Sequence, residues 1–582
     1  MMQNKVYKPV YSEGARCQDC YKCVRECPVK AIRVTNNQAS IVPELCIVCG
    51  HCVSVCPSGA KKVRDDLPDV KQVISNGSRV FVSLAPSFVS EFNGVGPAKL
   101  IHTLKMLGFS GVSETALGAQ QVSAQAASDI ERNADKNNLY ISSACPVVVE
   151  YISKYLPERA ASITHILSPL LAHCKLIKDN FGEDTSVVFI GPCIAKKLDA
   201  HYHPELLSAA ITFEDLRAWL ADEKISLDDI QPDDSDIFIP KKAAEGAIYP
   251  VEGGMLEATR LNCVGTKAQF QSISGIENID KALRSIDPAN ISHSVFLELL
   301  ACEGGCVNGP KAQERSEIES RLNILDYTDF SPDAYPRRPA IGLADDLHTP
   351  PISRTDYTQQ EIESTLHKIG KQSIEDELNC GGCGYHSCRE LAWAILAGNA
   401  EPNMCVSYMR ELAQKKANAI LHTLPYATVI VDEKLSIIEC NSEFVKLGGS
   451  DLELVSEAVP GLVGAALSSI LPFSELFADV LESGEDIIRK YIRFGDTVLS
   501  VTIFTVERHR VVGAIMINVT STELRREQIV EKAQQVIQNM LTNVQDIAFR
   551  LGKSSAESEL ILNSIVDGFS VARYDKDEEM EK

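Results

Sequence analysis

The sequence has little of several features that would assign it to a common class of protein. It has two tryptophans among 582 residues, and aromatic residues make up 6% of the chain. No apolar run reaches the roughly 20 residues that a membrane span needs. The first residues, MMQNKVYKPVYSEGARC, lack the apolar stretch of a signal peptide. A glycine-rich phosphate loop, a kinase signature and a helix-turn-helix pattern are also missing. We therefore expect a cytoplasmic protein without a membrane span, whose output acts through a partner.

Positive charge is scarce as well. The chain has 57 Lys and Arg against 79 Asp and Glu, a net charge of −22. Such a chain is repelled by nucleic acids and by anionic membranes, so we expect neither as a partner. The composition, 45% hydrophobic and 23% charged, is that of a globular protein. The length predicts about three to five domains.

Cysteine, by contrast, is abundant, with 19 residues. Eight of them precede residue 57, and four more lie between residues 380 and 405. A reducing cytosol disfavours a disulfide framework, and clustered cysteines in such a protein indicate metal ligands. Cys174, Cys263 and Cys440 match no ligand pattern, and we expect them to be free structural cysteines.

The N-terminal cysteines form a repeat. CQDCYKCVRECP (17–28) and CIVCGHCVSVCP (46–57) share the pattern C-x₂-C-x₂-C-x₃-C-P, 29 residues apart. This is the bacterial two-cluster ferredoxin pattern, in which the fourth cysteine of each run binds the other cluster. Zinc is the alternative, but two quartets closed by Cys-Pro argue against it. The predicted ligand sets of two 4Fe-4S clusters are Cys17, Cys20, Cys23 and Cys56, and Cys46, Cys49, Cys52 and Cys27.

From about residue 79 to 345 the pattern is that of an α/β domain. Residues 79–87 and 185–193 are short β-branched runs typical of buried strands, and residues 98–109 have helical spacing. Four cysteines lie at expected strand or loop ends, and two of these flank a Gly-Gly that would allow a bulky group near the backbone. Each is either a buried small hydrophobe or a metal ligand. The four are Cys145, Cys193, Cys302 and Cys306.

Four motifs in this region resemble the signatures of the iron-only (Fe–Fe) hydrogenases. SSACP (142–146), GPCIAKKLD (191–199) and LELLACEGGCVNG (297–309) resemble T-S-C-C-P, M-P-C-x₂-K-x₂-E and E-x-M-A-C-x₂-G-C-x₂-G-G. GGMLEATR (253–260) resembles G-G-V-M-E-A-A-x-R. The resemblance covers about residues 5 to 345.

The resemblance implies a particular cofactor. Cys145, Cys193, Cys302 and Cys306 would bind a four-iron cubane, and Cys306 would bridge it to a two-iron subsite with CO, cyanide and dithiolate ligands. Lys196 would pair with one cyanide. Pro86 and Ser87 lie where the family cradles the other cyanide, and would tune the metal without ligating it.

The chain departs from the family at the residues that move protons. Catalytic members have a cysteine before the first ligand, where this chain has Ala144. Loss of positioned acid–base groups typically costs roughly 10² to 10⁴ in rate. This predicts a site that binds or slowly exchanges hydrogen, unless water or another side chain restores the path. The other departures are Gln125 and Ala126 at two glutamates, Thr164 at a relay serine, and Gly191 and Leu300 at two methionines; Asp129 stands at a third acidic position.

The last third of the chain predicts three more segments. Residues 380–405 resemble the small iron–sulfur domain of corrinoid and electron-transport proteins, with Cys380, Cys383, Cys388 and Cys405 as ligands. Zinc is the alternative there, and we expect His386 to be a surface residue. Residues 420–449, with strand-like runs at 486–494, 497–507 and 510–520, resemble a PAS domain without a haem or flavin ligand. His422 and His509 are expected at its surface, and its expected role is docking or dimerisation.

A helical face then follows, and the chain closes with a solvated charged tail (575–582). The face consists of Ile529, Ala533, Val536, Met540, Val544, Ile547 and Leu551, at steps of three and four. It would pack against its own PAS domain or pair with a second copy.

The expected fold is therefore a mixed α/β and α+β multidomain protein. The expected domains are a ferredoxin-like dicluster module (1–75), a hydrogenase H-cluster domain (79–345), a 4Fe-4S domain (355–412), a PAS domain (416–520) and a helical segment (521–570). The first hypothesis is a hydrogen or redox sensor with low turnover that acts on a partner kinase or phosphatase, as a homodimer formed through PAS and helix. The second is a ferredoxin-linked hydrogenase that interconverts protons and H₂. The third is a non-catalytic iron–sulfur scaffold, like the cluster-assembly relatives of this fold.

Overall fold

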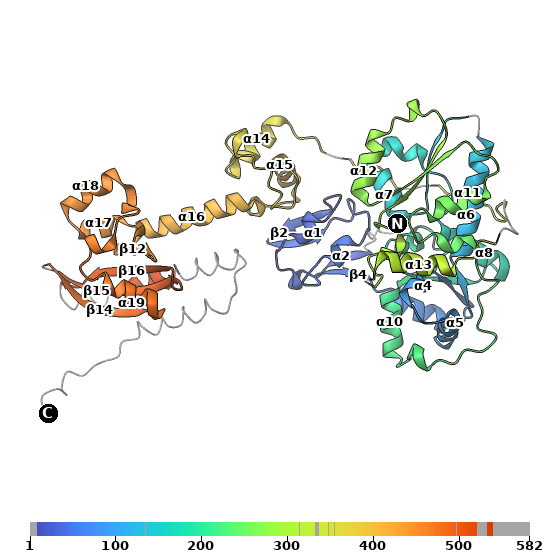
Figure 1. Ribbon diagram of the computed structural model, residues 1–582, viewed down its shortest axis with the longest axis horizontal. Helices are drawn as coiled ribbons and strands as arrows, with labels where there is room; N and C mark the ends of the chain where they lie inside the picture. Colours follow the sequence, from blue (N-terminus) through green and yellow to red (C-terminus); the bar gives the residue numbers. More distant parts are fainter. Residues whose placement is uncertain are drawn as a thin grey trace, which may run out of the picture. The chain divides into compact units, whose positions relative to one another are not determined.

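The computed structural model describes two compact units, residues 1–405 and 406–582 (Figure 1). The described residues are 9–133, 136–313, 315–331, 337–346, 349–353, 355–495, 497–520, 532–538 and 540. Within these residues, no helix is both long and apolar enough to cross a membrane.

The first unit begins with a small domain built from two similar halves. Strand β1 (Val10–Ser12) pairs antiparallel with β4 (Lys61–Val63), and β2 (Ile32–Thr35) pairs antiparallel with β3 (Gln38–Ile41). The short helices α1 (Lys22–Arg25) and α2 (His51–Ser54) contain the third cysteine of each repeat. Val10, Ile47 and Val48 share a buried core with the following domain, so the two are packed together.

The following domain has two parallel sheets. The first has the strand order β6-β5-β8-β9, and the second has the order β10-β11-β7. The strands of both sheets are mostly buried, as the continuous apolar runs predict. Their bounds are β5 Val80–Leu84, β6 Gly111–Glu114, β7 Leu139–Ile141, β8 Ser186–Gly191, β9 Ala209–Thr212, β10 Gln269–Ser274 and β11 Val295–Leu300.

Helices cover these sheets, and α6, α8 and α11 lie side by side in Figure 1. The helix predicted over residues 98–109 is present as α5 (Pro97–Met106), which ends three residues earlier than expected. The other helices are α3 Leu67–Ser75, α4 Phe88–Glu91, α6 Ala116–Arg132, α7 Pro146–Tyr155, α8 Pro169–Phe181, α9 Lys196–Tyr202, α10 Phe213–Asp222, α11 Gly254–Asn262, α12 Ile276–Ser285 and α13 Glu317–Tyr327.

The first unit ends with two helices, α14 (Gln359–Lys368) and α15 (Cys388–Leu396), which pack against each other. Thr358 caps α14, since its hydroxyl accepts from the Glu361 backbone amide while the Glu361 carboxylate accepts from the Thr358 amide. The segment is attached to the first domain through the β2–β3 hairpin, where the Val34 amide donates to the Asn399 carbonyl at 2.9 Å.

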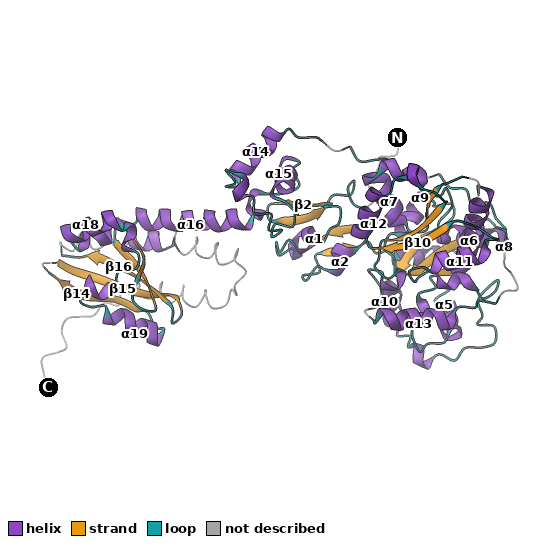
Figure 2. Cartoon of the chain, turned by 45° about the horizontal axis from the view of Figure 1, so that its top comes forward, coloured by secondary structure: helices purple, strands orange, loops and turns teal. Residues whose placement is uncertain are grey.

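The second unit begins with α16 (Val406–Thr423), which is longer than the linker helix predicted over about 406–418. Five antiparallel strands follow in the spatial order β13-β12-β16-β15-β14, with three helices (Figure 2). The strands lie where the sequence predicts them. They are β12 Ala427–Asp432, β13 Ile437–Cys440, β14 Ile487–Phe494, β15 Thr497–Glu507 and β16 Val511–Asn518, and the helices are α17 Ser442–Leu447, α18 Ser450–Ala458 and α19 Glu475–Ser483.

The predicted C-terminal helix lies largely outside the described residues. Residues 532–538 are helical, and Ala533 is buried. Ile529, Val544, Ile547 and Leu551 are outside the described residues, so both interpretations of this helix stay predictions.

Candidate metal centre

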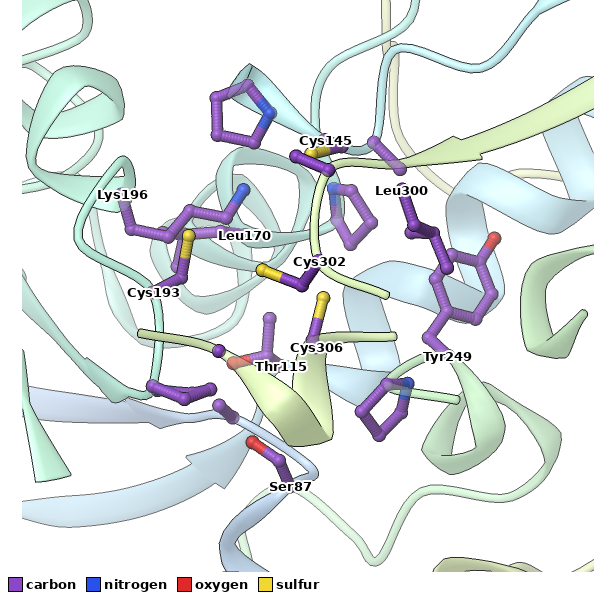
Figure 3. A pocket seen from close by; sticks show the side chains of 18 of the residues that line it. Ser87, Thr115, Cys145, Leu170, Cys193, Lys196, Tyr249, Leu300, Cys302 and Cys306 are labelled. Atoms are coloured by element: carbon purple, nitrogen blue, oxygen red, sulfur yellow. The ribbon is translucent and has the colours of Figure 1, made fainter. Parts of the chain in front are cut away.

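A cavity of about 110 Å³ lies where the strands of both sheets end (Figure 3). Ala85, Pro86 and Ser87 follow β5, Thr115 follows β6, and Cys193 follows β8. Residues after β7 and β11 contribute to the lining from the second sheet. In open α/β sheets, ligands bind at the carboxyl ends of the strands. The fold therefore brings residues that are distant in sequence to one site.

The four cysteines predicted from the central region all line this cavity. Cys145 precedes α7, while Cys302 and Cys306 lie in the loop after β11. Burial raises the pKa of Cys193 to about 11 and that of Cys302 well above its usual range. Free thiolates would be costly here, but binding to a metal deprotonates a thiol because the cation offsets the charge.

Lys196 lines the same cavity from α9. Its ammonium donates to an Asp199 carboxylate oxygen at 2.9 Å and to the Ser168 hydroxyl at 3.3 Å. Burial lowers the pKa of Lys196, but the charge of Asp199 and the nearby thiols of Cys193 and Cys145 raise it to a net value above the usual one. A cation is thus held at the wall of a largely apolar cavity.

Pro86 and Ser87 lie at the opposite wall, as Figure 3 shows for Ser87. Ser87 is 2% exposed, and its hydroxyl oxygen has no hydrogen-bond partner within the described part of the chain. A buried hydroxyl without a partner is costly, and such groups are rare in folded proteins. A four-thiol set with a cation and an unsatisfied hydroxyl fits a metal–sulfur group with anionic ligands.

The glycines in this region have a packing role as well as the one that the sequence suggests. Gly305 has φ +111°, and a Cβ there would collide with the Pro250 carbonyl oxygen and lie 2.9 Å from Val251. Gly305 therefore allows close packing of protein backbone, and the expectation that the two glycines admit a bulky inorganic group stays a prediction. At Gly191, where the family has methionine, a Cβ would meet the Phe189 ring and lie 2.7 Å from Ala85. Phe189 itself lines the cavity.

Ala144 also lines the cavity, beside Cys145. Its methyl group cannot transfer a proton. The nearby helix α6, every residue of which is described, has no titratable side chain among its buried positions. Asp129 is partly exposed and accepts from Gln125 at 2.9 Å, while Thr164 is hydrogen-bonded to Ser143 at 3.2 Å.

His173 and Glu298 are among the buried titratable residues of this domain that the sequence did not indicate. His173 is fully buried between the hydroxyls of Ser83 and Ser113, each 2.8 Å from a ring nitrogen, and burial lowers its pKa to about 3. Glu298 lines the cavity and accepts from the Gly253 and Met255 amides, and burial raises its pKa to about 7. Single buried polar residues carry no periodic signal, but Glu298 belongs to the same motif (297–309) as Cys302.

The two N-terminal cysteine runs have the same backbone conformation. Left-handed residues occur at equivalent positions, Asp19 and Val48, Tyr21 and Gly50, and Lys30 and Gly59, with φ between 52° and 78°. The Ala31 and Ala60 amides donate to Cys27 and Cys56 sulfurs at 3.3 and 3.2 Å. Non-glycine residues in this conformation are uncommon and cluster at functional sites.

The electrostatic neighbours of these cysteines fall into two sets. Those of Cys23 include Cys17, Cys20 and Cys56. Those of Cys52 include Cys27, Cys46 and Cys49, while Cys23 has a weaker effect on Cys52 than these three. Burial raises the pKa of Cys23 to about 11 and that of Cys49 to about 12. Within this part of the chain, the structure brings together the sulfurs that the repeat assigns to each site.

Cys49 connects the N-terminal domain with the cavity. It lines the cavity together with the four central cysteines. A Cβ on the adjacent Gly50, which has φ +78°, would lie 2.5 Å from Ile194 and 2.8 Å from Pro310. The loop that contains Cys49 therefore packs against the segments that follow Cys193 and Cys306.

The third set, Cys380, Cys383, Cys388 and Cys405, lies in the α14–α15 segment. Cys380 and Cys405 are electrostatic neighbours of Cys383, whose pKa is raised by burial. His386 is exposed, as expected. Cys174 and Cys440 are buried and Cys263 is partly buried, and none of the three lies in a set of this kind among the described residues.

The segment docks on the N-terminal domain through several contacts. Arg33 and the Val34 amide donate to Asn399, and the Asn36 amide donates to Glu401 at 2.7 Å. Gly384 has φ +94°, and a Cβ there would lie 2.9 Å from Val24. Gly384 and Val24 each adjoin a predicted ligand, Cys383 and Cys23.

Three segments of the chain match known protein families. Residues 78–310 match "Iron only hydrogenase large subunit, C-terminal domain". Residues 9–57 match "4Fe-4S dicluster domain", and residues 376–407 match "Putative Fe-S cluster". These segments contain all of the cysteines that the sequence predicts as ligands.

Whole-protein comparisons give distant relatives. Iron hydrogenase 1 of Clostridium pasteurianum is 23% identical over 46% of this chain, which covers 58% of that protein's length. The cytosolic Fe-S cluster assembly factor narfl of Danio rerio is 24% identical over 48% of this chain and 83% of its own length. A solved variant of FeFe-hydrogenase HydA1 from Chlamydomonas reinhardtii is 18% identical with a TM-score of 0.37, covering 45% of this chain and 90% of that one.

Each matched segment contains one of the groups of cysteines that the sequence predicts as ligands. The chain is thus an iron–sulfur protein with an iron-only hydrogenase large-subunit domain, which lies between a 4Fe-4S dicluster domain and a further Fe-S segment.

Proposed function

We propose that the chain is a hydrogen or redox sensor with low H₂ turnover, which signals through residues 427–518 to a partner protein. The observation that carries this proposal is the composition of the cavity. The groups suited to holding a metal cofactor are present, namely four cysteines, Lys196 and the unsatisfied Ser87 hydroxyl. The adjacent wall has Ala144, and the buried positions of α6 carry no titratable side chain.

The cofactor set of the proposal follows from the cysteines. The N-terminal domain would hold two 4Fe-4S clusters, the cavity would hold a cubane with a CO- and cyanide-bearing two-iron subsite, and the α14–α15 segment would hold one further cluster. A two-iron subsite supplies reversible hydrogen binding and electron exchange. The protein contributes the apolar cavity around it and the cation of Lys196.

The contacts within the first unit support an electron route through the N-terminal domain. Cys49 lines the cavity, and Cys23 is an electrostatic neighbour of Cys52 on the other cysteine set. Tyr385, which follows the Cys383–Gly384 pair, has both Cys383 and Cys27 among its electrostatic neighbours. Electrons from the cavity would therefore reach the α14–α15 segment as well as an external ferredoxin or other carrier.

The covalent connection to the second unit supports the output of such a sensor. Cys405 is followed directly by Val406, the first residue of α16. The element order after α16, two strands, helices and three strands, is the order that the sequence resemblance to a PAS domain predicts. A change at Cys405 would be passed along α16 to this domain, to a homodimer formed by it and the C-terminal helix, and to a kinase or phosphatase.

The test is an infrared spectrum of protein matured anaerobically with its two-iron cofactor, recorded before and after addition of H₂. CO and cyanide stretching bands that shift under H₂, together with little turnover in the same sample, are expected. Absence of the bands after maturation confirmed in a catalytic relative would contradict the proposal. It would favour a scaffold role, for which the similarity to the assembly factor is the supporting observation.

The variant Ala144→Cys separates a sensor from a catalyst with altered proton access. A titratable thiol beside Cys145 would restore one positioned acid–base group, so turnover should rise by roughly 10² or more. The matched control is Ala144→Ser, which adds similar volume with a hydroxyl that does not titrate near neutral pH. High turnover of the unmodified protein and no gain in Ala144→Cys would favour the ferredoxin-linked hydrogenase.

A further inference from the structure

A second cavity, of about 60 Å³, lies behind Lys196. A water molecule needs roughly 10–15 Å³ of such volume together with polar partners, so this cavity has room for several waters. Its lining combines apolar residues with several titratable and hydroxyl side chains. The lining residues that matter here are Ser143, Glu150, Ser168, Asp199, His203, Asp345 and Asp346.

Lys196, Ser168 and Asp199 form the wall between the two cavities. Lys196 lines the four-cysteine cavity, whereas Ser168 and Asp199 line the second cavity. The Lys196 ammonium donates to Asp199 at 2.9 Å, and the Ser168 hydroxyl donates to the same carboxylate oxygen at 2.9 Å. Asp199 is 7% exposed and Ser168 is 6% exposed. A continuous set of hydrogen bonds therefore crosses the wall.

The far side of the second cavity leads to the surface. His203 lies 3.7 Å from an Asp345 carboxylate oxygen, and both residues are partly exposed. Asp346, also in the lining, is exposed. Glu150 is buried there and accepts from Thr349 at 2.6 Å. Titratable groups therefore line the second cavity from Asp199 to the partly exposed pair of His203 and Asp345.

We propose that Lys196, Asp199 and the second cavity form the route by which protons reach and leave the four-cysteine site. This inference rests on the proposed function, since it requires a site that binds hydrogen. Splitting of one H₂ yields two protons and two electrons, and the electrons pass to the iron–sulfur groups and then to the carrier. Each proton is taken up by Lys196 as Lys196 gives one to Asp199, which releases it to water in the second cavity. After each transfer, the side chains of Lys196 and Asp199 have returned to their starting protonation states.

The other buried titratable groups near the site are less suited to this task. The Glu298 carboxylate is engaged by the backbone amides of Gly253 and Met255, which anchors the start of α11. His173 is enclosed between two hydroxyls and does not line the four-cysteine cavity. The Tyr249 hydroxyl is hydrogen-bonded to Ser123, and burial raises its pKa beyond the range in which it would exchange protons.

The test uses the loaded full-length protein and time-resolved infrared spectra in the carboxylic acid C=O region, recorded while H₂ is being split. A proton that passes through Asp199 gives a transient band there that shifts in D₂O. The band should be absent in Asp199→Asn and retained at a changed frequency in Asp199→Glu. Exchange of H₂ with solvent deuterons should slow by roughly 10² or more in Asp199→Asn.

Asp129→Asn is the matched control, because Asp129 stands at an acidic position of the family's own relay and outside the second cavity. Its spectrum should be that of the unmodified protein. Loss of the band in Asp129→Asn, or its persistence in Asp199→Asn, would overturn the inference. If the CO and cyanide bands are missing from the unmodified protein, the proposed function itself has failed, which is a separate outcome.

Ser168→Ala provides a second variant that keeps the carboxylate. It removes the hydroxyl that donates to Asp199 at 2.9 Å, so the Asp199 band should move to another frequency. If Asp199→Asn loses its CO and cyanide bands, it no longer holds the cofactor and its carboxyl band cannot be interpreted. Ser168→Ala then tests whether the carboxyl band belongs to Asp199. An unmoved band in Ser168→Ala would show that the signal comes from another carboxyl group.

Discussion

The docking of the α14–α15 segment on the N-terminal domain gives a prediction that the structure makes quantitative. In Gly384→Ala, the new methyl group would lie 2.9 Å from Val24 Cγ1 and 3.1 Å from the Arg25 backbone nitrogen, at a residue with φ +94°. The left-handed conformation costs alanine about 1–2 kcal/mol. Overpacking against a helix backbone costs about 1–3 kcal/mol more.

Gly381→Ala is the matched control within the same CGGCG sequence. Gly381 has φ +70°, but its Cβ would have no neighbour closer than 4.0 Å, the Tyr385 carbonyl oxygen. Gly381→Ala therefore has the cost of the left-handed backbone conformation but not the cost of overpacking. The two variants should therefore differ by about 1–3 kcal/mol in the free energy of docking, which is roughly 5- to 150-fold in the population of the undocked state.

Amide hydrogen exchange of Val34 measures this directly, because its amide donates across the interface to the Asn399 carbonyl. Exchange at Val34 should be faster in Gly384→Ala than in Gly381→Ala by that factor. The Ser142 amide, which donates to the Leu297 carbonyl within the hydrogenase domain, should exchange equally in both. Equal exchange at Val34 in the two variants would refute the reasoning that Gly384 is a tight contact.

Two more predictions concern single buried side chains. Ser87→Ala should raise the unfolding free energy of the protein without its cofactor by about 1–3 kcal/mol, because it removes a buried hydroxyl that has no partner among the described residues, and it should shift a cyanide band in the infrared spectrum of the loaded protein. A spectrum identical to that of the unmodified protein would remove Ser87 from the site. His173, with its pKa lowered to about 3 by burial, stays neutral when folded and becomes protonated below about pH 6.5 when unfolded. The unfolding free energy should therefore fall by up to about 1.4 kcal/mol per pH unit as the pH decreases from 6.5 towards 3. His173→Gln should lack this contribution, so its unfolding free energy, measured in denaturant titrations, should fall less between pH 7 and 5.5 than that of the unmodified protein. An equal fall in the two proteins would contradict the prediction.

Much of the candidate site could be predicted from the sequence because its chemistry is concentrated in short motifs. Cysteine spacing assigned the N-terminal ligand sets, and the position of Cys145, Cys193, Cys302 and Cys306 after strands brings them to one edge of the sheets. The strands from β12 to β16 also follow from β-branched runs. These features depend on residues within about ten positions of one another.

The remaining features depend on contacts between residues that are distant in sequence. Nothing near Asn399 indicates that it pairs with Val34, and nothing near Asp199 indicates a second cavity behind it. For Gly305, the sequence does not indicate the contact with the backbone of Pro250 that its φ allows. Single polar or small residues have no periodicity, so their role appears only when the tertiary neighbours are known.

The spacing of the four central cysteines along the chain also affects the entropy of the unfolded protein when they bind one group. They come from both sheets and span residues 145 to 306, so a group bound by all four would cross-link three closed loops. Closing a loop of about 100 residues, similar to the interval from Cys193 to Cys302, lowers the entropy of an unfolded chain by an amount worth about 4.7 kcal/mol at 25 °C. Such a group would hold the two sheets together in the way that a disulfide holds a secreted domain. Loss of iron would then loosen the whole domain, and the Ser142–Leu297 hydrogen bond between β11 and the residue after β7 would open with it.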